Sequence, residues 1–197
     1  MPVQIGAKVE GFSNPTGLLS DCHRRIEMFL GSLEAVAKLL DRPLAEEARR
    51  ALASALRYFR EAAPKHTADE EESLFPRLRR ITHPEVQAAL AELDALEKDH
   101  RWAVPLHDEV ERLGQLALSH GHLSNTEAEA FREAVGKLAA MYRRHIQLED
   151  RVVFPVAARL LPAAEQAALA GEMARRRNAV PSFDAQMETH GAAQPRK

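Results

Sequence analysis

Several features that mark particular protein classes are scarce in this 197-residue chain. Its single cysteine, Cys22, excludes an intrachain disulfide, and its 5% aromatic content and lack of β-branched runs leave few candidate strands. A formal net charge of −2 lacks the basic excess of most nucleic-acid-binding domains. No apolar run approaches the roughly 18 residues of a membrane span, and residues 1–4 do not begin a secretory signal. We therefore expect a globular cytoplasmic protein with no nucleic-acid or membrane partner.

The abundant residues, Ala, Leu, Glu and Arg, favour helices. Apolar residues recur at helical spacing in four long segments separated by short turns, over residues 16–40, 44–80, 84–120 and 125–161. Short turns between long helices make sequential neighbours antiparallel. The sequence therefore predicts an all-α protein, an up-down-up-down four-helix bundle with a short extra C-terminal helix.

Helix-breaking and capping residues predict where these segments begin and end. Pro64 predicts a kink or a local break in the second segment, and Gly121 predicts a stop after the third. Ser124 or Asn125 can cap the fourth, and Pro162 opens the shorter fifth helix. We expect an N-terminal extension over 1–15, the bundle over 16–161, the additional helix over 162–180 and a disordered tail over 181–197.

The apolar stripe of each predicted long helix contributes one histidine at a similar height: His23, His66, His100 and His145. With a rise of about 1.5 Å per residue, antiparallel helices meet at positions equally far from their shared turn. The distances from the shared turn agree closely for the second and third helices and for the third and fourth. They agree less closely for the first and second, where a distortion at Pro64 could absorb the difference. The four histidines are therefore expected in one layer of the core, where unpaired polar groups are costly.

The chain also contains a duplicated motif. HTADEEESLFP, from His66 to Pro76, and HIQLEDRVVFP, from His145 to Pro155, share a histidine, a glutamate four residues on, a further acid and a closing Phe-Pro. A histidine and a glutamate at this spacing lie on one helix face and can reach one cation, or the carboxylate can bridge two. Two other pairs share the spacing, His23–Glu27 and His107–Glu111, so the duplication is the specific signal.

With one upstream histidine before each motif, the chain resembles the hemerythrin family, in particular its HHE cation-binding branch, over about residues 18–155. The resemblance implies a four-helix bundle with two iron ions, bridged also by an oxo or hydroxo group, with zinc or manganese as possible substitutes. Six residues would be the metal ligands: His23, His66, Glu70, His100, His145 and Glu149. The two glutamates would bridge the ions, and the histidines would be terminal ligands.

One position departs from the oxygen-carrying members of that family. They have a second histidine four residues after the one on the third helix, where this chain has Val104. Water, Glu71 or Glu27 could supply the missing ligand, or the position could stay open. An open position favours redox reactivity or sensing over reversible oxygen carriage.

The resemblance leaves three functions open. The first is a di-iron protein that binds or senses oxygen, nitric oxide or peroxide without being an enzyme in the usual sense. The second is a di-iron enzyme that reduces nitric oxide or peroxide, or repairs iron–sulfur centres. The third is a bundle that zinc merely stabilises. The sequence does not predict the oligomeric state.

Other polar residues have simpler interpretations. His107 is expected to be a hydrogen-bonded core histidine, and Cys22 a small buried residue. In the acidic run 69–72, only Glu70 lies on the apolar stripe, so the others are expected to be exposed. Four residues near the proposed ligands are candidates to orient them: Asp21, Glu71, Asp99 and Tyr142.

Overall fold

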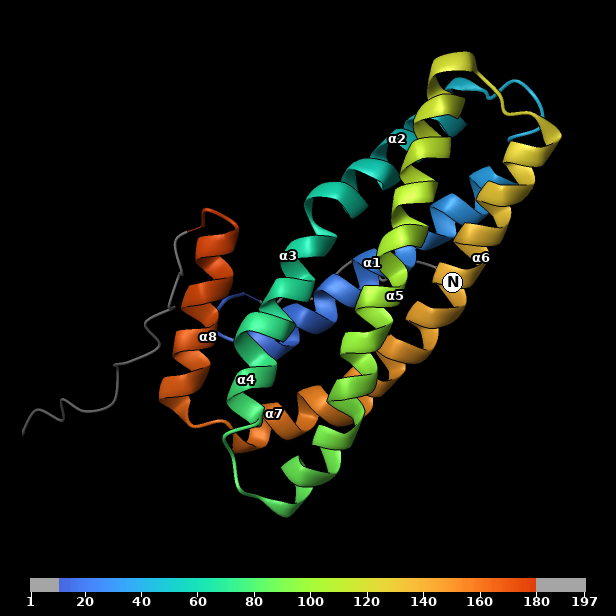
Figure 1. The fold of residues 1–197 in the computed structure, drawn as a ribbon. Helices are drawn as coiled ribbons and strands as arrows, with labels where there is room; N and C mark the ends of the chain where they lie inside the picture. The colour runs from blue at the N-terminus through green and yellow to red at the C-terminus, as the bar shows by residue number, and fades with distance from the viewer. Residues whose placement is uncertain (1–10, 180–197) are drawn as a thin grey trace, which may run out of the picture.

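The computed structural model describes residues 11–179, and these form helices joined by short loops, with no strand among them (Figure 1). The elements are α1 (Pro15–Ala37), α2 (Glu46–Glu61), α3 (Ala63–Ala68), η1 (Asp69–Leu74), α4 (Phe75–Leu78), α5 (Pro84–His120), α6 (Asn125–Leu148), η2 (Glu149–Val153), α7 (Phe154–Leu160) and α8 (Ala163–Arg176). The all-helical prediction is confirmed. The expected tail at 181–197 lies outside the described residues.

The long helices pack side by side along their lengths. α1 contacts α2 and α6, and α5 contacts the same two helices on the other side (Figure 1). At one end, the two loops of the bundle are tied together: the Leu44 amide donates to the Gly121 carbonyl, and the Leu123 amide donates to that of Leu40. The loop between α4 and α5 lies at the opposite end (Figure 1).

The helix ends follow the chemistry expected of them. Ser124 caps α6 in a capping box with Glu127, and Gly121 ends α5 at a φ of 85°. Such a left-handed residue at the end of a helix is most easily a glycine. The distortion expected at Pro64 is a local break of one residue, since α2 ends at Glu61 and α3 begins at Ala63.

Two segments of π-helix, η1 and η2, were not anticipated. Each begins at or beside the glutamate of a duplicated motif, and in each the amide of the motif's phenylalanine donates to that glutamate's carbonyl, five residues back. Proline follows each phenylalanine and has no backbone N–H, so it cannot donate the next hydrogen bond of a regular helix. Each π-turn therefore ends at a position where a regular helix would also lack a donor. π-turns inside helices are frequent at functional sites.

The apolar core has two parts, and a polar layer separates them. One part includes Ile26, Leu56 and Leu138, toward the tied loops, and the other includes Leu19, Leu93 and Val153. Along α1, α5 and α6–η2, the residues between these two parts are the histidines and glutamates of the predicted site. No helix of the described chain is both long and apolar enough to cross a membrane.

Candidate metal centre

The six predicted ligands lie together in the layer between the two parts of the core. His23 comes from α1, His66 from α3, His100 from α5 and His145 from α6, while Glu70 and Glu149 lie in the π-segments. Both glutamates are fully buried, and His23, His66 and His145 are buried; the His100 side chain is 8% exposed. The expectation of one common layer is therefore confirmed.

The six side chains form two groups that overlap. One group is His23, His66, Glu70 and Glu149, and the other is Glu70, His100, His145 and Glu149. Within each group, the potential ligand atoms lie within 4.8 Å of one another. Both glutamates belong to both groups, so each group has two imidazoles and shares the same two carboxylates with the other.

The two oxygens of Glu70 face different groups. Its Oε1 lies 3.1 Å from His66 Nε2 and 3.9 Å from His23 Nε2, whereas its Oε2 lies 3.5 Å from His100 Nε2. Glu149 Oε2 lies 3.1 Å from the Nε2 atoms of both His23 and His145. Each glutamate thus reaches histidines of both groups, as a bridging carboxylate would.

The polar atoms of this layer are poorly satisfied by the protein itself. Within the described part of the chain, none of the four oxygens of Glu70 and Glu149 has a hydrogen bond of good geometry, nor does His23 Nε2. The Nε2 atoms of His100 and His145 lie only 3.1 Å apart, pointing at each other. Buried polar atoms without partners are rare and costly. A cation among them would satisfy these atoms together, so the residues fit a metal.

The shifted pKa values of the buried groups in this layer also fit a cation site. Burial, together with the Glu149 carboxylate, raises the pKa of Glu70 well above its usual range. Although burial opposes it, the close His145 and His23 imidazoles lower the pKa of Glu149. For His23, the contacts with Asp150 and Glu149 outweigh burial and raise the pKa to about 9. Without a cation, protons bound to these groups therefore balance the buried charge, and metal binding would displace those protons.

The acid that follows each glutamate reaches a histidine of the other half of the chain. Glu71 Oε1 lies 2.8 Å from His100 Nδ1, and Asp150 Oδ1 lies 3.0 Å from His23 Nδ1. Ser20 also donates to Asp150, at 2.7 Å. Such carboxylates fix the tautomer and orientation of a metal-binding imidazole, so that Nε2 faces the metal.

Two of the other candidates for orienting residues also lie beside a proposed ligand. Asp99 lies 3.6 Å from His145 Nδ1 and pairs with Arg144 at 2.7 Å. The Tyr142 ring contacts the His145 ring at a centroid distance of 6.3 Å, and its hydroxyl contacts His107, while Asp21 pairs with Arg24. Asp150 was missed, although the acid shared by the two motifs was the signal that could have found it.

With this geometry established, comparison with known proteins gives a consistent result. Residues 14–157 match the hemerythrin HHE cation-binding domain. The chain belongs to this family. An uncharacterized protein of Haemophilus influenzae is 28% identical over 141 residues, which cover 71% of this chain and 76% of the relative. The domain is thus a cation-binding one, and its His and Glu side chains form groups able to hold metal.

A cavity of about 450 Å³ lies beside this candidate centre, between α2–α3 and α5. His100 and Glu71 line one part of it, and Val104, which stands where oxygen carriers have a histidine, lines another with 56% of its surface exposed. Glu27, the other substitute ligand considered, is exposed and lies in neither group. Glu71 is engaged with His100 Nδ1, so it orients a histidine instead of replacing one.

His107 also lines this cavity and confirms the expectation of a hydrogen-bonded histidine. Its Nε2 lies 2.9 Å from the Tyr142 hydroxyl, and its ring contacts Phe59 at a centroid distance of 5.0 Å. Burial lowers the pKa of His107 to about 4 and raises that of Tyr142. The pair is therefore neutral at pH 7.

Replacing His107 with phenylalanine should flatten the pH dependence of stability. Between pH 6.5 and 4 the unfolded chain protonates this histidine and the native protein does not. Lowering the pH through this range therefore lowers the free energy of unfolding by roughly 2–3 kcal/mol. His107→Phe removes that contribution. Urea unfolding at pH 7 and pH 4.5, in chelator, measures it. His120→Phe, which removes an exposed histidine from the end of the same helix, should leave the wild-type slope; equal slopes in all three proteins would contradict the assignment.

Proposed function

We propose that this protein binds two iron ions between His23, His66, His100, His145, Glu70 and Glu149, and that it binds or senses a small redox molecule there. The observation that carries the proposal is the pair of overlapping groups, each with two histidines, that share both glutamates. Glu70 and Glu149 would bridge the ions, and the histidines would be terminal ligands. Oxygen, nitric oxide and peroxide are the candidate molecules.

The donor set favours iron. Imidazole and carboxylate together suit borderline first-row metals, with zinc and manganese as competitors. Two ferrous ions and two glutamates leave a charge of +2, which suits an additional anionic bridge. When bound, such a pair supplies electrons to a small oxidant or binds it directly. Four imidazoles distinguish the site from di-iron bundles in which four glutamates and two histidines hold the ions.

The protein's contribution is orientation, proton control and access. Asp150 and Glu71 hold the Nε2 atoms of His23 and His100 toward the glutamates. The two parts of the apolar core shield the layer from bulk water along the bundle. The cavity beside His100 offers a path for a small molecule. A site with such access favours reaction with an external molecule over a structural zinc site, which is usually closed.

The up-down-up-down arrangement expected from the sequence is part of this proposal. The contacts of α1 and α5 with both α2 and α6 support it, as do the tied loops at one end and the α4–α5 loop at the other. In that arrangement each hairpin, residues 15–78 or 84–160, contributes both histidines of one group.

Metal analysis of protein purified without added metal tests the proposal. We expect two irons per chain and near-ultraviolet charge-transfer absorbance that changes on reduction and on exposure to oxygen or nitric oxide. One zinc per chain with a featureless spectrum would support the stabilised-bundle alternative instead. Turnover of nitric oxide or peroxide by iron-loaded protein, or its restoration of damaged iron–sulfur centres, would support the enzyme alternative.

A further inference from the structure

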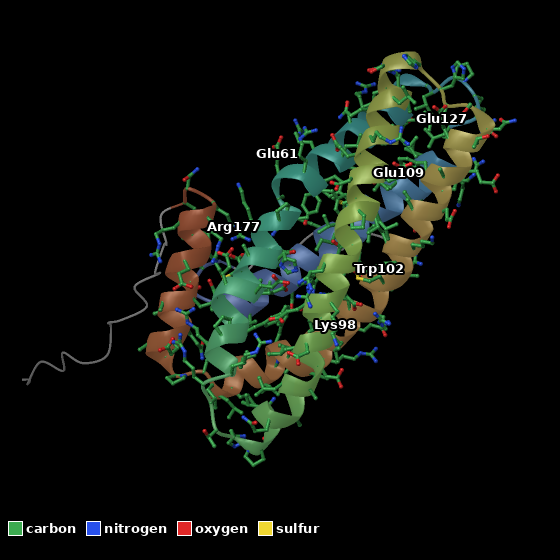
Figure 2. All side chains as sticks on the ribbon, in the orientation of Figure 1. Glu61, Lys98, Trp102, Glu109, Glu127 and Arg177 are labelled. Carbon is green, nitrogen blue, oxygen red and sulfur yellow. The ribbon has the colours of Figure 1, made fainter. Side chains whose placement is uncertain are left out.

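Helix α8 lies outside the residues matched by the family, yet it packs against η1, the π-segment that carries Glu70 (Figure 1). Two ion pairs join it to α4: Arg77 forms a two-pronged pair with Glu172, at 2.9 Å for each contact, and a single pair with Glu165 at 2.9 Å. At its C-terminal end, α8 presents Arg176 and Arg177 to η1, and Figure 2 shows Arg177 beside α3.

Asp69, the residue before Glu70, forms ion pairs with both arginines. It is fully buried, contrary to the expectation that this part of the acidic run is exposed. Arg176 Nη1 lies 2.9 Å from its Oδ1, and Arg177 Nη2 lies 2.6 Å from its Oδ2. A buried carboxylate is tolerated only with such partners, and removing them leaves a charge that destabilises its surroundings.

Arg176 contacts more of η1 than Asp69 alone. Its Nη2 donates to the Ser73 hydroxyl at 2.8 Å and to Glu72 Oε2 at 3.0 Å. One side chain of α8 thus touches three of the six residues of the π-segment, on both sides of Glu70 and Glu71 in sequence. A planar guanidinium with several fixed donors is suited to hold such a set in one geometry.

The second motif lacks this arrangement. The position equivalent to Asp69 is Leu148, which packs against the apolar core. The residue before Glu149 is therefore held by apolar packing, and the residue before Glu70 by charged groups from α8. This asymmetry between two otherwise similar motifs identifies a specific task for α8.

We propose that Arg176 and Arg177 are positioning residues for Glu70: through Asp69 they fix the π-segment, so that the cation affinity of the centre depends on α8. This inference rests on the proposed function for its metal readout. In this proposal α8 positions a residue of the centre, although α8 itself contributes no metal ligand. If α8 merely adds stability, its loss would lower the melting temperature and leave the centre unchanged.

Cobalt(II) titration of the full chain separates these two roles, because cobalt absorbance reports both affinity and ligand geometry. We expect the Arg176→Gln/Arg177→Gln double variant to bind cobalt at least tenfold more weakly and with altered bands. The corresponding double lysine variant should recover part of the affinity. Arg175→Gln removes one positive charge from an exposed position of α8, and Glu165→Gln removes a contact between α8 and Arg77 of α4; both should match the wild type within twofold.

A second readout needs no metal. The Phe75 amide donates to the Glu70 carbonyl and closes the π-turn, so its hydrogen exchange in metal-free protein should be faster in the double variant than in the two controls. Wild-type cobalt affinity and bands in the double variant, with only a lower melting temperature, would overturn the inference, and so would unchanged exchange at Phe75. If the wild type itself fails to bind cobalt, the proposed function fails, and the exchange result alone decides whether α8 holds the segment.

Discussion

Glu70→Gln is expected to have opposite effects on the metal-loaded and the metal-free protein. With metal, the variant loses a bridging ligand of both cation positions, so metal content should fall below that of the wild type. The stabilisation that bound metal provides, about 4 kcal/mol at a free concentration one thousand times Kd, should be lost with it. Metal analysis and thermal unfolding with excess metal measure both effects.

Without metal, the same substitution should stabilise the protein by roughly 1–3 kcal/mol at pH 8. Burial and the Glu149 carboxylate raise the pKa of Glu70, so the native protein keeps a proton that the unfolded chain releases above about pH 4.5. Stability therefore falls as pH rises, and glutamine removes this penalty. The gain should vanish toward pH 4, where both states are protonated.

Glu61→Gln, at an exposed end of α2 (Figure 2), is a matched control that should change neither metal content nor this pH slope. Destabilisation of the metal-free protein by Glu70→Gln would show that the protein alone needs this carboxylate. Unchanged metal content would show that Glu70 is not a ligand.

The second large effect concerns the acids that orient histidines. Asp150→Asn and Glu71→Gln keep the size of each side chain and remove its charge. Loss of such a partner typically weakens metal binding 10- to 100-fold. Because Asp150 contacts His23 and Glu71 contacts His100, each variant should weaken mainly one of the two cation positions.

Stepwise chelator competition resolves the two positions. We expect one ion to leave each variant at a lower chelator concentration than the wild type, with the second held more nearly as before. Glu27→Gln removes an exposed acid four residues after His23 and should leave both steps unchanged. Equal loss of both ions in both variants would contradict the assignment of one acid to one position.

The common layer of the six proposed ligands could be predicted because it follows from helical periodicity. Histidines at equal heights on four apolar stripes, and a glutamate one turn after two of them, require only the rise and pitch of a helix. The structure brings all six together. Even the orienting acids were visible as the acid that follows each motif glutamate, although which histidine each one reaches depends on how the helices cross.

What the sequence could not predict depends on contacts between distant residues. Asp69 was expected on an exposed face, but Arg176 lies 107 positions away and covers it. The π-segments were missed because hydrophobic periodicity does not distinguish a single wide turn from a regular one. The cavity beside His100 depends on side-chain packing around Val104, which a linear pattern does not contain.

The division of ligands between the two hairpins has a consequence for assembly. In the proposed centre, each hairpin would supply two histidines for one cation and share its glutamate with the other, and a short loop, residues 79–83, is the covalent link between the hairpins. The same centre would form if the first hairpin of one molecule paired with the second hairpin of another. Chelation would remove the ions that the hairpins share in this proposal, so we expect chelation followed by metal return at high protein concentration to be a route to domain-swapped dimers.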